Sequence, residues 1–245
     1  FIPWDDDTDI CMLREDYQRF LKVAPLELTG EYHINSPYSE ESYNYVFSRI
    51  LNATSISYDY SRLSQFHRCP YIIGVDIFPL DTVTTNPDEE SILYQLIHIL
   101  ISAVNQYDDK PEEVISMIPD LEKLCNIKLD TSRCIKNQLL RIADSLCQIY
   151  NGSNSSFISY IPEDSQKDIR LQREWFNTYD YLPFENILIP VPKQYDDILT
   201  ALYGDYMTPI QNCAGHDYPF YKKQTNAMTK YITQTIMDGK KPFIF

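Results

Sequence analysis

The chain has little positive charge, and this shortage excludes two classes of function. Its 245 residues include 21 lysines and arginines against 35 aspartates and glutamates, which gives a formal net charge of −14. Nucleic-acid phosphates and anionic lipid headgroups are bound mainly through Lys and Arg. The sequence therefore predicts no nucleic-acid partner and no broad adsorption to an acidic membrane, although a local basic pocket remains compatible with this charge.

Long apolar runs and closely paired cysteines are also missing. No run reaches the roughly 18 apolar residues of a membrane span, because the best candidate, 92–104, is interrupted by Gln95 and His98. We expect no transmembrane segment. Since no CxxC or CxxH spacing occurs, we also expect thiols in a reducing compartment rather than a disulfide framework. Together these features predict a cytoplasmic protein, at most peripheral at the inner face of the membrane.

The patterns that are present predict one mixed domain of the α+β (α/β mixed) class spanning 1–245. Alternation predicts a strand at 54–60, and an apolar run predicts an interior strand at 71–78, close enough for a hairpin. Short strands and turns are expected over 157–192. Apolar residues at helical spacing predict a helical layer or insertion at 88–150. The individual helices are expected at 13–21, 89–107, 111–125, 131–150 and 195–202.

An acidic cluster precedes the first predicted helix and is placed on a short strand or at its exit. Asp5, Asp7 and Asp9 are spaced by two, so on an extended chain their carboxylates project from one face. Three neighbouring carboxylates repel one another unless a cation neutralises them. Mg²⁺ or Mn²⁺, held by carboxylates and substrate phosphates, is the natural cofactor.

Other interpretations of the cluster are a solvated acidic turn and a helix N-cap. The flanking Trp4 and the apolar residues 10–13 argue against simple solvation. A calcium-binding EF-hand loop is excluded, because Ile10 stands where that loop needs glycine and Asp16 stands where it needs glutamate.

Asp76 is a second acidic feature, because it lies inside the apolar run 71–78. A buried carboxylate is costly unless it is paired or binds a metal. A hydrogen bond to a helix N-terminus would be a purely structural explanation. A carboxylate pair on one strand with a third acid on its neighbour is instead typical of nucleotidyl- and phosphoryl-transfer sites.

Three blocks of the sequence resemble one known family. They are FIPWDDDTDI at 1–10 with REDY at 14–17, VDIFPLD at 75–81, and YGDYM at 203–207 followed by His216. In this order they are similar to the signature of the LicD/fukutin family. The resemblance implies a nucleotidyltransferase-like fold with a small sheet. It also implies an enzyme that transfers a phospho-substituent, phosphocholine or a phosphoalditol, from a CDP-activated donor to a hydroxyl of a cell-surface glycan.

The resemblance also implies roles for particular residues. Asp7 and Asp9 match the metal-binding pair, and Asp5 would be an additional or outer ligand. Asp76 matches the third catalytic carboxylate, which binds metal or takes the proton of the acceptor hydroxyl. The remaining matched residues imply a substrate-binding pocket: Arg14, Asp205 and His216.

One departure from the family keeps two alternatives open. Family members carry a G-[TS]-L-L-G-x-x-R stretch just before the acidic block, whereas this chain starts at that block. We therefore expect the first strand and its glycine loop to be missing from the chain as given. A DxD-type glycosyltransferase that uses a nucleotide-sugar is one alternative, and a non-catalytic binding domain is the other.

Overall fold

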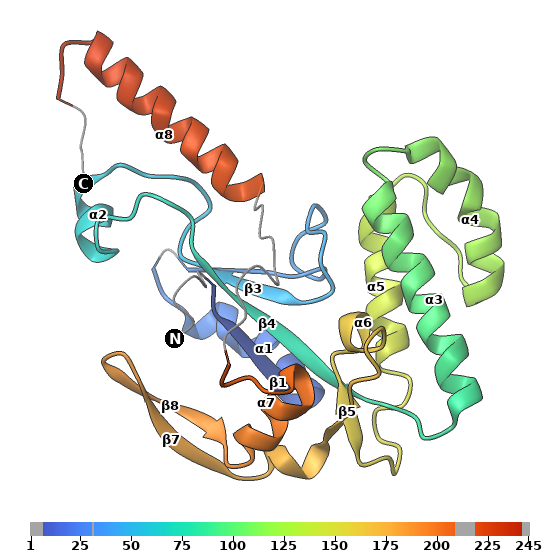
Figure 1. Ribbon diagram of the computed structural model, residues 1–245. Coiled ribbons are helices and arrows are strands. Elements are labelled where there is room, and N and C mark those ends of the chain that lie inside the picture. The colour runs from blue at the N-terminus through green and yellow to red at the C-terminus, as the bar shows by residue number, and fades with distance from the viewer. Residues whose placement is uncertain (1–6, 31, 209–218, 242–245) are drawn as a thin grey trace.

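The computed structural model describes residues 7–30, 32–208 and 219–241. Within them, a mixed six-stranded sheet lies at the centre, with helices around it and a separate β-hairpin (Figure 1). The strands are β1 (Asp9–Leu13), β2 (His33–Asn35), β3 (Ser48–Leu51), β4 (Gly74–Thr82), β5 (Phe157–Ser159), β6 (Leu171–Gln172), β7 (Tyr179–Phe184) and β8 (Ile187–Pro192). The helices are α1 (Arg14–Glu27), α2 (Tyr60–Gln65), α3 (Pro87–Gln106), α4 (Pro111–Cys125), α5 (Ile135–Cys147), α6 (Ile161–Asp164), α7 (Tyr195–Tyr203) and α8 (Pro219–Met237), with a 3₁₀ turn, η1 (Arg173–Phe176).

Strand β4 organises the sheet. The strand order is β2-β3-β4-β5-β6, and β1 pairs with β4 in parallel, whereas the other pairs are antiparallel. The register places Asp9 opposite Asp76 and Leu13 opposite Leu80. Because partners in register project from the same face of a sheet, Asp9 of β1 and Asp76 of β4 share a face.

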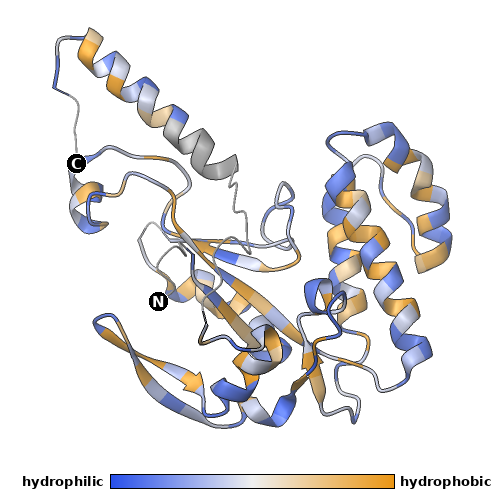
Figure 2. Cartoon of the chain, in the orientation of Figure 1, coloured by the Kyte–Doolittle hydropathy of each residue, from blue (hydrophilic) through white to orange (hydrophobic). Residues whose placement is uncertain are grey.

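The two faces of the sheet are covered by different helices. On one face, Leu80 belongs to the main hydrophobic core, together with buried residues of α3, α4 and α5 such as Leu100, Val114 and Leu139. Figure 2 shows hydrophobic residues along β4 and on these helices. On the other face, Tyr17 of α1 is buried and its hydroxyl is hydrogen-bonded to that of Ser48 on β3.

Three of the five predicted helices are confirmed within two residues of their ends, whereas the helix expected at 13–21 extends to Glu27. The helix at 111–125 has the expected bounds, and its first-turn proline and glutamates favour the positive end of the helix dipole. The helix predicted at 131–150 begins only at Ile135, because Asp130 accepts hydrogen bonds from the backbone and hydroxyl of Ser132 and holds a turn there. The mixed α and β class is likewise confirmed.

The predicted strand at 54–60 and its hairpin are wrong. Residues 54–59 are irregular, α2 begins at Tyr60, and the strand before β4 that pairs with it in antiparallel is β3. The side chain of Asn52 accepts a hydrogen bond of 2.8 Å from the backbone N–H of Ile73, and the loop returns to β4 there. Alternating polar and apolar residues in 54–60 therefore do not mark a strand here.

The interior strand is confirmed but shifted, because β4 runs through Pro79 to Thr82. The backbone N–H of Asp76 donates to Thr8 on the β1 side of β4. Because backbone N–H groups alternate between the two sides of a strand, the backbone nitrogen of Pro79 points to the other side, where β3 and β5 lie. Pairing with β3 ends at Ile77 and pairing with β5 starts at Asp81. Pro79 lies in this interval, where its missing N–H removes no hydrogen bond of the ladder.

The described cysteines are all free thiols: Cys11, Cys69, Cys125, Cys134 and Cys147. This confirms the expected lack of a disulfide framework for these five residues. In the part of the chain that the structure describes, no helix combines the length and apolarity needed to cross a bilayer.

The buried Tyr17 leads to a prediction about alkaline stability. Burial raises its pKa to about 12, whereas the phenol titrates near 10 in the unfolded chain. Between these values the unfolded state has lost a proton that the folded state keeps, so stability falls as pH rises. We expect Tyr17→Phe to remove this contribution, up to about 1.4 kcal/mol per pH unit.

The measurement is the free energy of unfolding in urea from pH 9 to pH 12, roughly the range in which phenols ionise. Tyr179→Phe on β7 is the control, because Tyr179 is exposed. An identical pH slope for the wild type and Tyr17→Phe would contradict the prediction.

Candidate functional site

The parallel pairing of β1 and β4 brings two of the predicted carboxylates together. Asp9 and Asp76 are direct partners in register, and neighbouring strands lie about 4.8 Å apart. The backbone N–H of Asp76 also donates to the carbonyl of Thr8 over 3.3 Å. Asp7, which precedes β1, is exposed. Asp5 lies outside the described residues.

Asp76 is neutralised by an arginine that sequence reasoning missed. Arg49 of β3 lies opposite Asp76 in the antiparallel register. Its Nε and Nη2 bind the two carboxylate oxygens, and the Nη2–Oδ2 distance is 2.5 Å. Hydrogen bonding to Asp76 raises the pKa of Arg49, so its guanidinium stays charged. The ion pair compensates the charge of a carboxylate inside an apolar strand. The partner of Asp76 is therefore an arginine and not a helix N-terminus.

Aromatic side chains surround the pair. The guanidinium of Arg49 lies 5.7 Å from the ring centre of Tyr45 and 5.8 Å from that of Phe47, within the range of cation–π attraction. The ring of Phe47 in turn lies 4.7 Å from that of Phe78 on β4. These rings hold Arg49 beside the acidic residues and limit the water around them.

The donor set is chemically suited to a hard divalent cation, although a complete ligand group is not assembled among the described residues. No three His, Cys, Asp or Glu side chains in 7–30, 32–208 and 219–241 lie close enough together to form a metal site. Asp9 and Asp76 nevertheless supply carboxylate oxygens from adjacent positions on one face, and oxygen is the ligand that Mg²⁺ prefers. The metal-binding role of these residues stays a prediction.

The sheet is packed tightly beneath Arg49. A Cβ atom at Gly74 would lie 2.9 Å from Cγ and Cδ of Arg49 and 2.8 Å from a methyl group of Leu51. Contacts this short force a neighbour to move, and Arg49 is the more flexible of the two. Glycine at this position therefore leaves the stem of Arg49 the room to reach Asp76.

We expect Gly74→Ala to displace the Arg49 guanidinium and to lower the rate of the reaction at this site by about ten- to a hundredfold, the cost of a misplacement on the order of 1 Å. The measurement is kcat together with the melting temperature. The control is Gly239→Asn, because a Cβ atom at Gly239 would meet no atom within 4 Å and asparagine tolerates its positive φ of 72° better than alanine does. Unchanged kcat in Gly74→Ala would show that the position of Arg49 does not matter.

Arg14 lies in a second, separate cluster of charges. Its guanidinium binds both oxygens of Asp81, at 2.7 and 2.5 Å, and one oxygen of Asp144 at 2.9 Å. All three residues are buried. Asn151 donates to Asp81 over 2.6 Å and Tyr38 donates to Asp144. The cluster ties α1 to β4 and α5.

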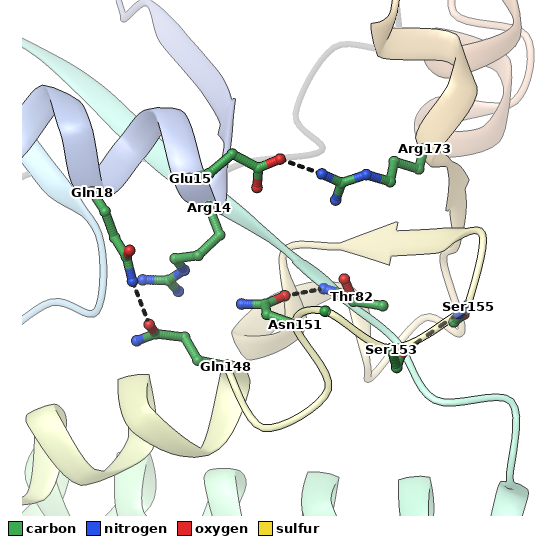
Figure 3. Close-up of a pocket in the computed structure, with 10 residues that line it drawn as sticks. Arg14, Glu15, Gln18, Thr82, Gln148, Asn151, Ser153, Ser155 and Arg173 are labelled. Carbon is green, nitrogen blue, oxygen red and sulfur yellow. Dashed lines mark hydrogen bonds and ion pairs between the residues drawn. The ribbon is translucent and has the colours of Figure 1, made fainter.

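A pocket of about 480 Å³ lies beside this cluster. It is lined by the first turns of α1, the end of β4, the loop after α5 and Arg173 of η1 (Figure 3). Arg14 lines it, but its guanidinium is committed to two carboxylates. The pocket adjoins the C-terminal end of β1, whereas Asp9 is at the other end of that strand. The role of Arg14 in substrate binding stays a prediction.

The third sequence block is only partly described. Asp205 is exposed in the turn after α7, where it accepts a hydrogen bond of 2.8 Å from the hydroxyl of Thr208. Tyr206 donates to Asp196 of α7 over 2.6 Å. His216 lies outside the described residues. Whether Asp205 and His216 bind substrate stays a prediction.

Two further residues of these clusters were missed. Arg49 carries no sequence signal, because β3 was not predicted and its partner is 27 residues away. Asp144 lies on a predicted amphipathic helix among apolar residues, and this placement could have marked it as a buried charge that needs a partner.

Comparison with known proteins gives one informative result. The chain is 29% identical over 223 residues to the lipopolysaccharide cholinephosphotransferase LicD of Haemophilus influenzae, and the match covers 84% of this chain and 76% of that protein. No protein-family model and no solved structure matches the chain.

Proposed function

Because the chain belongs to the LicD family, we propose that it is a transferase that moves a phospho-substituent onto a glycan. The relative from Haemophilus influenzae is by name a cholinephosphotransferase that acts on lipopolysaccharide. For this chain the transferred group is phosphocholine or a phosphoalditol, the donor is a CDP-activated small molecule, and the acceptor is a hydroxyl of a cell-surface glycan or its precursor. The reaction is placed in the cytoplasm, at the inner face of the membrane.

The observation that carries this proposal is the register of β1 with β4. It sets Asp9 beside Asp76 on one face of the sheet, and Asp7 precedes Asp9 on the same segment. In the proposed nucleotidyltransferase-like fold, Asp7 and Asp9 would hold Mg²⁺ or Mn²⁺, with Asp5 as a further ligand. A bound divalent cation would neutralise phosphate oxygens of the donor and orient them.

Asp76 and Arg49 act on the acceptor hydroxyl and its proton. The acceptor oxygen attacks the phosphorus that carries the transferred group, the bond from that phosphorus to CMP breaks, and CMP leaves with the bond's electron pair. Asp76 either completes the cation's ligands or accepts the proton of the acceptor hydroxyl. Arg49, bidentate on Asp76, holds that carboxylate in place.

The test is CMP release by the purified protein with CDP-choline, CDP-ribitol or CDP-glycerol as donor and lipopolysaccharide core oligosaccharide as acceptor. We expect CMP formation with one of the CDP donors, loss of it with EDTA, and recovery with added Mg²⁺. Turnover of UDP-sugars instead would favour the DxD glycosyltransferase. If no donor is turned over or bound in the presence of Mg²⁺, a non-catalytic binding domain becomes the better description.

A further inference from the structure

The pocket beside Arg14 differs from an ordinary small-molecule site. Pockets of several hundred Å³ are usually lined mainly by apolar and aromatic side chains. Here nine of the ten lining residues have polar side chains, and the tenth is Gly152. Such a lining favours a ligand that offers several hydrogen-bonding groups.

The charges in this pocket are balanced within the protein. Glu15 and Arg173 form an ion pair across it, as Figure 3 shows. Arg14 is bound between Asp81 and Asp144. A phosphate group is normally held by arginine or lysine side chains that can turn toward it. Because both lining arginines already bind carboxylates, the pocket is poorly suited to a nucleotide or a free phosphate.

The remaining lining groups are amides and hydroxyls. Gln18 donates to Gln148 over 2.8 Å, and Gln148 in turn donates to Asp144, so the carbonyl oxygen and the second N–H of Gln18 are the amide groups left for a ligand. Ser153 and Ser155 accept backbone hydrogen bonds of 3.4 and 3.3 Å. In both contacts the serine is the acceptor, so its O–H hydrogen is left to donate to a ligand. Sugar hydroxyls, which donate and accept, match such a surface.

We propose that this pocket binds uncharged sugar units of a glycan, a role that rests on the proposed function because these units belong to the acceptor. Asp9 and the pocket lie at opposite ends of β1, roughly 13 Å apart along a strand that rises about 3.3 Å per residue. The pocket therefore holds sugars remote from the hydroxyl that reacts, and it favours oligosaccharide over monosaccharide acceptors.

The experiment measures binding without catalysis. The wild-type protein is screened on an array of uncharged oligosaccharides, lipopolysaccharide core oligosaccharides and their phosphorylated forms, and the dissociation constants of the hits are measured by calorimetry. Ser153→Trp fills the pocket from an exposed loop position, and Gln18→Ala removes one amide. Asn154→Trp is the matched control, because Asn154 is exposed in the same loop but does not line the pocket.

We expect uncharged oligosaccharides to bind the wild-type protein. Ser153→Trp and Gln18→Ala should raise the dissociation constant by about tenfold or more, which corresponds to about 1.4 kcal/mol. Asn154→Trp should leave the dissociation constant within about twofold of the wild type. Failure of every oligosaccharide to bind, or binding that Ser153→Trp leaves unchanged, would overturn the proposal. Competition by CDP or inorganic phosphate that Ser153→Trp abolishes would also overturn it. This binding experiment contains no CDP-activated donor. A failure to bind oligosaccharides and a failure to release CMP in the earlier assay are therefore independent results.

Discussion

Replacing Asp76 with asparagine is expected to lower kcat for transfer by about a thousandfold or more. In the proposed function Asp76 serves either the cation, whose charge stabilisation is worth several kcal/mol, or the proton transfer, which is worth about 10²–10⁴ in rate, and each 1.36 kcal/mol is a factor of ten. Asparagine keeps the size of the side chain and can still accept a hydrogen bond from Arg49. The substitution therefore removes the negative charge while it preserves most of the packing around β4.

The measurement is initial rates of CMP release at saturating donor, together with the melting temperature. Asp180→Asn is the control, because Asp180 of β7 is an exposed aspartate. Its ion pair with Lys193 is long, at 3.7 Å. We expect Asp180→Asn to retain full activity. Full activity of a folded Asp76→Asn protein would remove Asp76 from the reaction and leave Asp7 and Asp9 as the only candidate carboxylates of the described site.

Replacing Arg14 with methionine is expected to lower the free energy of unfolding by about 3–5 kcal/mol, the cost of removing one partner of a buried ion pair. Asp81 and Asp144 are 1% and 2% exposed. Without the guanidinium, both carboxylates would remain buried without a compensating charge. The loss arises mainly from these two uncompensated charges and not from missing packing, because methionine replaces most of the side-chain volume.

Urea unfolding at neutral pH measures this effect. Arg19→Met, at an exposed position of the same helix, is the control and should stay within about 0.5 kcal/mol of the wild type. Replacing Arg14, Asp81 and Asp144 together with apolar residues should recover part of the loss. A loss below about 1 kcal/mol in Arg14→Met would mean that the cluster is hydrated and not a structural anchor.

The same variant separates the two roles of Arg14. If Arg14 only anchors α1, then KM and kcat measured well below the melting temperature should match the wild type. If it also contacts substrate, as the family resemblance implies, KM should rise at that temperature. The assay therefore tests the sequence-based assignment independently of stability.

Local patterns predicted the elements that depend on local interactions. The helix at 111–125 begins with a proline and two glutamates and ends at Asn126 in the left-handed conformation, and these signals are contained in the segment itself. The prediction of a strand at 54–60 was wrong because alternation indicates a half-buried surface and does not show that a neighbouring strand is available for pairing. The strand that pairs with β4 from this side of the sequence, residues 48–51, is four residues long and too short to show a period.

The candidate site depends on partners that are distant in sequence. The sequence shows that Asp76 needs compensation, because a carboxylate in an apolar run is costly. It does not show that Arg49 provides it, since this requires the register of β3 with β4. Similarly, the motif that contains Arg14 was recognised, whereas its burial between Asp81 and Asp144 is a result of packing.

The parallel pairing of β1 with β4 also bears on the order of folding. Arg14 and Asp81, at the ends of the two strands, are separated by 67 residues, and closing such a loop costs roughly 4 kcal/mol of chain entropy. The antiparallel contact of β3 with β4 spans a much shorter segment. Parallel, long-range pairing is slow, so β1 should dock late, onto a β3–β4 nucleus that already presents Arg49 and Asp76. A folding intermediate without β1 would then lack Asp9 at the site, and slow docking would limit how soon a newly synthesised chain becomes active.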